Sequence, residues 1–280
     1  MKNIFVVGAG TMGLDIAQVF CTAGFPVSVY DMTDEIIARS RARLEKGLKK
    51  RVDKGKITQE QMDSVLNGIE FTTQYDNAKH ADLIIEAIIE SVEVKKTVFR
   101  NLDGICPPET IFATNTSSIS ITEIASATSR PDRCIGMHFF NPATVMKLVE
   151  VIRGMATSDE TFKAVYELSE AIGKTPVEVA EAPGFVVNRI LIPMINEAIG
   201  LVAEGVASPE DIDTAMKLGA NHPMGPLALG DLVGLDVVLA IMDTLYKETG
   251  DGKYRAHPLL RKMVRGKLLG RKSGKGFYEY

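Results

Sequence analysis

Two ionisable side chains stand in apolar surroundings, twelve residues apart. His138 ends a segment expected to be a strand, 134–138, and Glu150 lies within a stretch of Leu, Val and Ile. The Asn141-Pro142 turn between them would let the chain fold back and bring the two side chains together. A carboxylate on one imidazole nitrogen fixes the tautomer and raises the basicity of the ring, which leaves the other nitrogen to exchange a proton with a substrate. The pattern therefore predicts a general acid/base pair. The alternatives are a histidine packed in the core and a glutamate exposed on an edge strand.

Polar residues also follow a second apolar segment, 111–114. In an open parallel sheet, ligands bind at the carboxyl ends of the strands, so Asn115 and Ser117 are expected to face the crevice there. A loop that only caps the following helix is the alternative, and it leaves both side chains without a role. Asn188, at the apolar start of a later helix, either satisfies a neighbouring backbone group or donates a hydrogen bond to a substrate oxygen. Both interpretations of Asn188 stay open on the sequence alone.

The segment GAGTMG, 8–13, has G-x-G-x-x-G spacing between an apolar strand and a helix. Gly8 permits a tight turn, Gly10 lets the backbone approach a pyrophosphate, and Gly13 allows the helix to pack closely on the sheet. Asp31, at the end of the second expected strand, would accept hydrogen bonds from the ribose hydroxyls and repel a 2′-phosphate. The pattern predicts a site for NAD rather than NADP. An Asp31 that only caps the next helix is the alternative.

Strands alternate with helices through the first half of the chain, which is typical of a parallel sheet with helices on its faces. The segment 34–66 breaks this rhythm, and its apolar spacing suits two helices joined near residues 53–55. We therefore expect an α/β fold over residues 1–182, a Rossmann-like, mostly parallel sheet domain with an inserted helical hairpin. The expected strands are 4–7, 27–30, 83–87, 111–114, 134–138 and 148–152, and the expected helices of the sheet are 13–23, 93–103 and 121–127.

Beyond residue 182 the alternation of strands and helices ends, and the sequence pattern is typical of helices alone. Pro183-Gly184 opens an apolar helix that contains Pro193, and Ser208-Pro209 has the cap and first-turn proline of a helix start. We expect an all-helical C-terminal domain over residues 183–280, which carries substrate contacts and dimerisation. Its many Leu, Met, Ile and Val residues suit pairing with a second copy, and they equally suit one self-contained bundle.

The composition is that of an ordinary globular enzyme. The chain has 280 residues, of which 45% are hydrophobic and 24% charged, and a formal net charge of -4, so a nucleic-acid-binding surface is not expected. No apolar run approaches the roughly 18 residues that span a bilayer. Three widely spaced cysteines form no metal-binding or disulfide pattern, so we expect reduced thiols, no metal and a cytoplasmic location. A basic cluster at 49–56 is either solvated surface or a site for the phosphate groups of a substrate.

Six segments occur in order along the chain, namely GAGTMG, IIEAIIE, NTSS, HFFNP followed by KLVEVI, PGFVVNR and GRKSGKGFYEY. Together they resemble the L-3-hydroxyacyl-CoA dehydrogenase family over essentially the whole length, above all its short bacterial members that act on 3-hydroxybutyryl-CoA. The resemblance implies an NAD-dependent oxidoreductase that interconverts 3-ketoacyl-CoA (acetoacetyl-CoA) and (S)-3-hydroxyacyl-CoA (3-hydroxybutyryl-CoA). Such chemistry serves both fatty acid metabolism and butyrate or butanol fermentation. Family members are typically homodimers through the helical domain, and the resemblance implies the same assembly here.

The resemblance also implies a role for each matching residue. The implied catalytic residues are His138 as general acid/base, Glu150 as its partner, and Ser117 and Asn188 at the substrate oxygen. The implied cofactor-binding residues are Gly8, Gly10, Thr11, Met12, Gly13, Asp31, Glu90, Lys95, Asn115 and Lys275. The implied substrate-binding residues are Ser117, Asn141, Asn188, Lys50 and Lys54, of which the two lysines match the coenzyme A region of the helical hairpin.

Two other functions remain open on the sequence. A β-hydroxyacid dehydrogenase acting on free acids would share the two-domain plan, but such enzymes typically rely on a lysine and need no basic hairpin. A non-catalytic nucleotide-binding structural protein would have no use for His138, Glu150 and Ser117, and all three are present.

Overall fold

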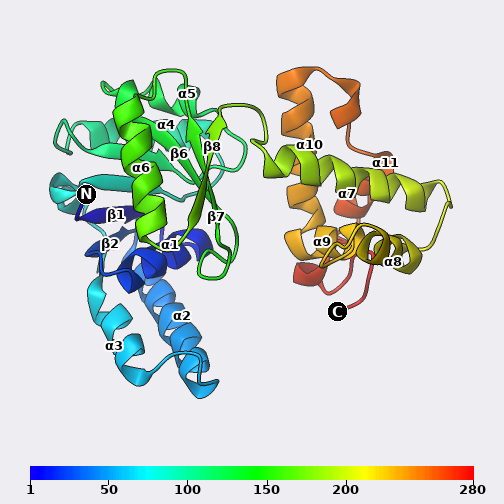
Figure 1. Ribbon diagram of the computed structural model, residues 1–280, viewed down its shortest axis with the longest axis horizontal. Coiled ribbons are helices and arrows are strands. Elements are labelled where there is room, and N and C mark those ends of the chain that lie inside the picture. The colour runs from blue at the N-terminus through cyan, green and yellow to red at the C-terminus, as the bar shows by residue number, and fades with distance from the viewer. The chain divides into compact units, whose positions relative to one another are not determined.

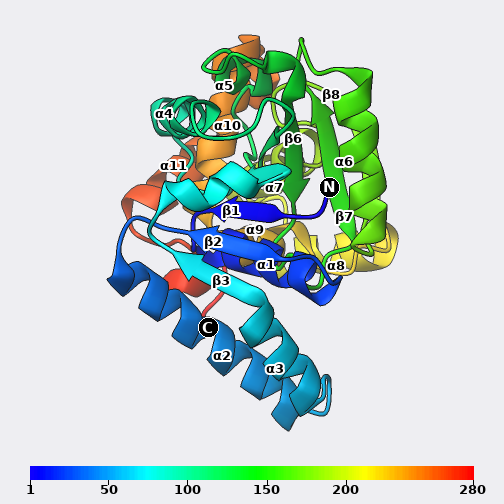
Figure 2. The same ribbon diagram turned by 90° about the vertical axis from the view of Figure 1, so that its left-hand side faces the viewer.

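All the strands of the chain form one sheet. The computed structural model describes residues 1–280 and divides them into two compact units, Met1–Glu181 and Ala182–Tyr280. The sheet belongs to the first unit and has the order β3-β2-β1-β4-β5-β6-β7-β8, with β6–β7 as its antiparallel pair (Figure 2). The strands are β1 (Ile4–Val7), β2 (Val27–Tyr30), β3 (Ile69–Thr72), β4 (Leu83–Glu86), β5 (Ile111–Thr114), β6 (Cys134–Phe139), β7 (Leu148–Arg153) and β8 (Thr175–Ala180). The parallel strands β1 to β6 therefore end at one common edge.

Helices cover both faces of this sheet, because its strands send alternate side chains to opposite faces. In β1, Ile4 and Val6 join one buried cluster, whereas Phe5 and Val7 join another. The first cluster is completed by α1 (Thr11–Thr22), α2 (Asp34–Asp53), α3 (Gln59–Gly68) and α6 (Asp159–Ala171), and the second by α4 (Val92–Asp103), α5 (Ile121–Ala125) and the short helix η1 (Tyr75–His80). The unit is thus a three-layer α/β structure.

The helical hairpin α2–α3 extends beyond the end of the sheet (Figure 1). Its two helices begin with side-chain caps, since Thr33 accepts a hydrogen bond from the Ile36 amide and Thr58 forms a capping box with Gln61. The apolar sides of the helices are buried, as Leu48 of α2 illustrates with 2% of its surface exposed. The opposite side of α2 is left for charged residues.

The second unit is helical and has its own core. Ile195, Leu235 and Leu245 are fully buried within it, and Ser208 caps α8 as expected from its position before Pro209. The helices are α7 (Val187–Ala203), α8 (Pro209–Gly219), α9 (Pro226–Val233), α10 (Leu235–Thr249) and α11 (Pro258–Arg265), with short helices η3 (Gly252–Tyr254) and η4 (Arg271–Ser273). The expected homodimer stays a prediction, because a single chain is described.

The predicted fold class is confirmed, as a mostly parallel sheet with helices and a helical C-terminal part. The expected hairpin is present as α2 and α3. Three elements were not predicted from the sequence, namely β3, α6 and β8. The two strands are poorly buried, since Glu70 in β3 and Glu178 in β8 are exposed, so neither resembled the apolar strands of the sheet centre. No helix has the length and hydropathy to cross a membrane.

Candidate active site

His138 and Glu150 are brought together by the antiparallel pairing of β6 and β7. The two residues lie directly opposite each other in the register of these strands, and Nδ1 of His138 lies 2.8 Å from Oε2 of Glu150. The side chains are almost inaccessible, with 4% and 1% of their surfaces exposed. A buried carboxylate is costly without a partner, so this hydrogen bond explains how Glu150 is tolerated inside a strand of Val, Leu and Ile. The expected contact between the two side chains is therefore present.

The turn that joins β6 to β7 is tied down from both sides. The Ala143 amide donates a hydrogen bond to Oδ2 of Asp15 in α1, at 3.2 Å. The ammonium of Lys174 donates to the carbonyls of Ala143 and Met146. Burial raises the pKa of Asp15, and the Ala143 amide and neighbouring cations lower it by less. These bonds fix the turn against α1 and so hold the ends of both strands in register.

The polar loop after β5 lies at the same end of the sheet as His138. The side-chain oxygen of Asn115 accepts a hydrogen bond from the backbone amide of Phe139 at 2.8 Å, next to His138. The backbone amide of Asn115 donates a hydrogen bond to the backbone carbonyl of Glu86 at 2.8 Å. The Ser117 amide donates to Oε1 of Glu90 at 2.8 Å. Asn115 thus has a structural task, which is to hold the loop against the end of β6.

A buried ion pair lies beneath this loop. The Nζ atom of Lys95 in α4 lies 2.7 and 2.9 Å from the two carboxylate oxygens of Glu86, at the end of β4, and 3.3 Å from Oε2 of Glu90. Glu86 also accepts hydrogen bonds from the hydroxyl of Thr114 and the amide of Ile88, both at 2.7 Å. Glu86 and Lys95 are 0% and 1% exposed. Lys95 therefore anchors the neighbouring Glu90 from within the protein.

Glu86 was not among the site residues predicted from the sequence. The signal was available, because Glu86 follows three apolar residues at the carboxyl end of an expected strand, and it lies opposite Thr114 at the end of β5. Glu90 has a lowered pKa. Burial would raise it, but the charge of Lys95 and the hydrogen bonds from Thr116 and Ser117 together outweigh burial. The Glu90 carboxylate is therefore ionised at neutral pH.

The glycine-rich loop between β1 and α1 has the geometry of a dinucleotide site. Gly8 has φ of 103°, and a Cβ on Gly13 would lie 1.8 Å from the Gly8 carbonyl oxygen, so both positions require glycine for the fold. Gly10 is different, because its φ is -64° and a Cβ there would meet nothing within 4 Å. Neither backbone nor packing requires glycine at this position. The close approach of a ligand does, at the N-terminus of a helix that favours an anion.

Asp31 lies beside this loop, as expected from its place after β2. Its Oδ2 accepts a hydrogen bond from the Ala9 amide at 2.8 Å, and its Oδ1 accepts one from the Met32 amide at 2.7 Å. The carboxylate is thus oriented by the backbone of the loop and of its own strand end. A fixed carboxylate here is what the ribose of NAD requires. Gly10 and Asp31 together fit the cofactor.

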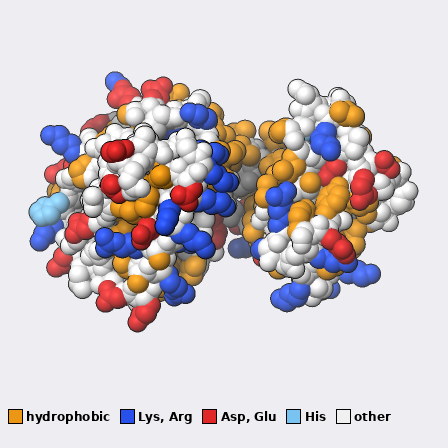
Figure 3. Space-filling view, turned by 90° about the horizontal axis from the view of Figure 1, so that it is seen from below, with side chains coloured by type: hydrophobic (Ala, Val, Ile, Leu, Met, Phe, Trp, Pro, Cys, Tyr) orange, Lys and Arg blue, Asp and Glu red, His pale blue; other side chains and the backbone are white.

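The remaining candidate residues lie elsewhere. Asn141 is exposed in the β6–β7 turn. Lys50 is exposed in the last turn of α2, and Lys54 is exposed at the C-cap of that helix. Figure 3, which views the molecule from the end where the hairpin extends, shows Lys and Arg side chains interspersed with acidic ones on that face. Asn188 and Lys275 belong to the second unit, where Lys275 Nζ lies 2.7 Å from a carboxylate oxygen of Glu279.

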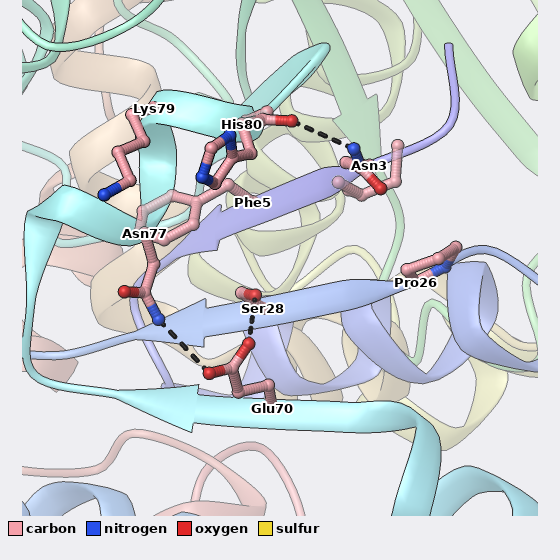
Figure 4. A pocket seen from close by; sticks show the side chains of 10 residues that line it. Asn3, Phe5, Pro26, Ser28, Glu70, Asn77, Lys79 and His80 are labelled. Carbon is pink, nitrogen blue, oxygen red and sulfur yellow. Dashed lines mark hydrogen bonds between the residues drawn. The ribbon is translucent and has the colours of Figure 1, made fainter.

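A hollow of about 420 Å³ lies at the opposite, amino end of the strands (Figure 4). It is lined in part by Asn3, Ser28, Glu70 and Asn77. Ser28 and Asn77 donate hydrogen bonds to the Glu70 carboxylate, at 3.1 and 3.3 Å, so its charged group is already satisfied. This hollow takes no part in the chemistry at the carboxyl edge.

A glycine-rich dinucleotide loop, an ordered carboxylate beside it and a histidine–carboxylate pair at one edge of a parallel sheet define a nicotinamide-dependent oxidoreductase. Comparison with known proteins supplies the family. Residues 3–182 match the family model described as 3-hydroxyacyl-CoA dehydrogenase, NAD binding domain, and residues 184–280 match 3-hydroxyacyl-CoA dehydrogenase, C-terminal domain. The chain belongs to the 3-hydroxyacyl-CoA dehydrogenase family, and its cofactor is NAD.

Several relatives match over nearly the whole chain. The 3-hydroxybutyryl-CoA dehydrogenase of Clostridioides difficile is 60% identical over 99% of each chain. The human mitochondrial hydroxyacyl-coenzyme A dehydrogenase is 45% identical over 100% of this chain and 91% of its own. The crystal structure of (S)-3-hydroxybutyryl-CoA dehydrogenase from Ralstonia eutropha has 50% identity and a TM-score of 0.96, covering 100% of this chain and 99% of its own. The predicted family is confirmed.

Two alanine substitutions in the glycine loop should separate folding from cofactor binding. Gly10→Ala should change the free energy of unfolding by less than about 1 kcal/mol, yet weaken NADH binding at least tenfold, since the methyl group would point where a phosphate is expected. Gly13→Ala should cost about 1–3 kcal/mol because its Cβ clashes with the Gly8 carbonyl. Thermal unfolding and NADH fluorescence titration measure the two effects. Unchanged NADH affinity in Gly10→Ala would contradict the placement of the cofactor.

Proposed function

We propose that this protein is an NAD-dependent 3-hydroxybutyryl-CoA dehydrogenase that interconverts acetoacetyl-CoA and (S)-3-hydroxybutyryl-CoA. The observation that carries the proposal is the buried 2.8 Å contact between Nδ1 of His138 and Glu150. It lies at the carboxyl edge of the sheet, the edge that also carries the glycine loop. The names of relatives that match the whole chain, including the 60% identical enzyme of Clostridioides difficile, support the choice of substrate.

His138 would transfer the proton of the reaction. The contact with Glu150 occupies Nδ1 and fixes the ring orientation, so Nε2 is the nitrogen that would meet the substrate oxygen at C3. When bound, NADH supplies the hydride for the ketone. In that direction His138, protonated and oriented by Glu150, gives its proton to the developing alkoxide. In the direction of oxidation it removes the hydroxyl proton.

The hydroxyl of Ser117 and the amide of Asn188 would stabilise the substrate oxygen as negative charge develops. Ser117 is suited to this task because its backbone is held by Glu90, which Lys95 anchors in turn. Asn141, in the turn that Asp15 and Lys174 fix through other residues of the turn, would contact the acyl group.

Acyl-CoA carries phosphate groups that need cations. Lys50 and Lys54 provide them on the exposed side of α2, and they are four residues apart, so their side chains lie on the same side of the helix. We assign these lysines to the coenzyme A part of the substrate. A free hydroxyacid would leave them without a function.

The proposed function is tested by the oxidation of NADH with acetoacetyl-CoA. We expect rapid loss of NADH absorbance with acetoacetyl-CoA, and little with free acetoacetate at the same concentration, because only the thioester engages the lysines of α2. The reverse assay with (S)-3-hydroxybutyryl-CoA and NAD should give NADH. Turnover of the free acids without turnover of the thioesters would favour a free-acid dehydrogenase, and no turnover with either would favour a non-catalytic nucleotide-binding protein.

Replacement of the histidine should abolish most of the turnover without affecting the fold. His138→Gln should lower kcat by about 10²–10⁴-fold, the usual contribution of a general acid/base, while the Kd for NADH changes little. His80→Gln is the matched control, because His80 is exposed at the amino end of the sheet and should leave kcat unchanged. Near-normal turnover in His138→Gln would refute the assignment.

Replacement of its partner should alter the pH dependence as well as the rate. A carboxylate favours the charged imidazolium, so Glu150→Gln should move the pH profile of kcat/KM to lower pH and reduce the rate at least about tenfold. Glu178→Gln on the neighbouring strand β8 is the control, since Glu178 is exposed and paired with Arg153. A reduced rate with an unshifted profile would mean that Glu150 does not act through the imidazole.

A further inference from the structure

One side of α2 carries a continuous row of cations. The spacing of four, three, four and four residues places their side chains along one side of the helix. The members of this row are Arg39, Arg43, Lys46, Lys50 and Lys54. Two of them have been assigned to acyl-CoA, at the far end of the helix. Arg43 lies in the middle of the helix and has different contacts.

Arg43 reaches the glycine-rich loop. Its Nη2 donates a hydrogen bond to the Ala9 carbonyl at 3.0 Å, and its Nη1 points to the Thr11 hydroxyl at 3.4 Å. The hydroxyl of Ser40, also in α2, donates to the same Ala9 carbonyl at 2.7 Å and is buried. Ser40 thus fixes α2 against the loop, and Arg43, one turn further on, is held at the start of α1.

The N-terminus of α1 has neither a capping side chain nor an acidic residue that would compete with a bound anion. Gly10 caps the helix without a side chain, and no acidic residue lies in the first turn. The first amides of a helix have no partner within the helix, and the pyrophosphate of a dinucleotide binds at this position. Arg43 is hydrogen-bonded to the residues on both sides of Gly10, so its guanidinium stands beside the expected pyrophosphate.

We propose that Arg43 binds the pyrophosphate of NAD. The bond to the Thr11 hydroxyl is long, and a guanidinium forms shorter, charge-assisted bonds to phosphate oxygens. Nη1 would therefore exchange the hydroxyl for a phosphate, while Nη2 keeps the Ala9 carbonyl. The proposal rests on cofactor binding and is independent of the acyl substrate.

The acidic groups nearby leave this charge available. Asp31 has both oxygens engaged by backbone amides of Ala9 and Met32. Asp15, in the second turn of α1, accepts a hydrogen bond from the Ala143 amide. Asp15 has three cationic neighbours, because Arg51 and Lys174 lie near it as well as Arg43. No ion pair joins Arg43 to a carboxylate within 4.0 Å, whereas both Glu86 and Glu90 are paired with Lys95 in this way. Arg43 is thus positioned by carbonyl and hydroxyl oxygens and keeps its charge for a ligand.

The test compares ligands with and without a pyrophosphate. Arg43→Gln should raise the Kd of NADH and of ADP-ribose about tenfold or more, and leave that of adenosine unchanged. It should also reduce the dependence of NADH binding on salt, and Arg43→Lys should recover part of the affinity. Arg39→Gln is the matched control, because Arg39 belongs to the same row and bonds only to the Glu35 carbonyl of its own helix, at 3.5 Å. NADH fluorescence and its displacement by the other ligands give these constants.

Three other outcomes would overturn the proposal. Equal weakening of adenosine would show that the substitution distorts the loop, although Ser40 still satisfies the Ala9 carbonyl in the variant. Weaker binding of coenzyme A, with NADH unaffected, would place Arg43 at the substrate's pyrophosphate. An unchanged NADH affinity would show that Arg43 does not bind the cofactor. Normal NADH binding without turnover of acetoacetyl-CoA would instead refute the proposed function and leave Arg43's role standing.

Discussion

The buried ion pair between Lys95 and Glu86 is the constraint on which the carboxyl edge of the sheet depends. It joins α4 to the end of β4, and through Thr114 to the end of β5. The same ammonium holds Glu90, which orders the loop at Ser117. Removing one member of a buried pair typically costs about 3–5 kcal/mol, because the other charge is left without a partner. The buried Lys95 therefore sets the positions of Glu90 and of the loop at Ser117, which lie at the edge of the sheet where ligands are expected to bind.

The direction of the strands accounts for the other half of the site. Parallel strands deliver their ends to one edge, but they cannot place two neighbouring strand residues opposite each other across a short turn. The antiparallel return of β7 does so, and it pairs His138 with Glu150 inside the sheet. The candidate site thus combines loops from the parallel part of the sheet with the hydrogen-bonded His138–Glu150 pair from the antiparallel part.

Much of this arrangement was accessible from the sequence because it depends on local patterns. The glycine spacing, Asp31 and the apolar segments identified the sheet and the cofactor loop, and the Asn141-Pro142 turn suggested that His138 and Glu150 meet. The Glu86–Lys95 pair was not accessible, since a lysine in a helix is ordinarily exposed and only the packing of α4 on the sheet buries it. The peripheral strands β3 and β8 escaped notice for a related reason, because their half-exposed side chains lack the apolar signature of central strands.

The length of α2 sets a distance within the proposed binding site. Ser40 and Arg43 attach the middle of the helix to the glycine loop, and the lysines proposed to bind acyl-CoA lie at its C-terminal end. From Arg43 to Lys54 the axis advances by about 16 Å at 1.5 Å per residue. In the proposed assignment, the number of residues between Arg43 and Lys54 therefore sets the distance between the dinucleotide loop and the phosphates of the substrate. Inserting one residue in between would swing the lysines by about 100° around the axis, whereas inserting seven would restore their direction about 10 Å further out. The proposed binding of acyl-CoA therefore depends on the length of this helix as well as on its side chains.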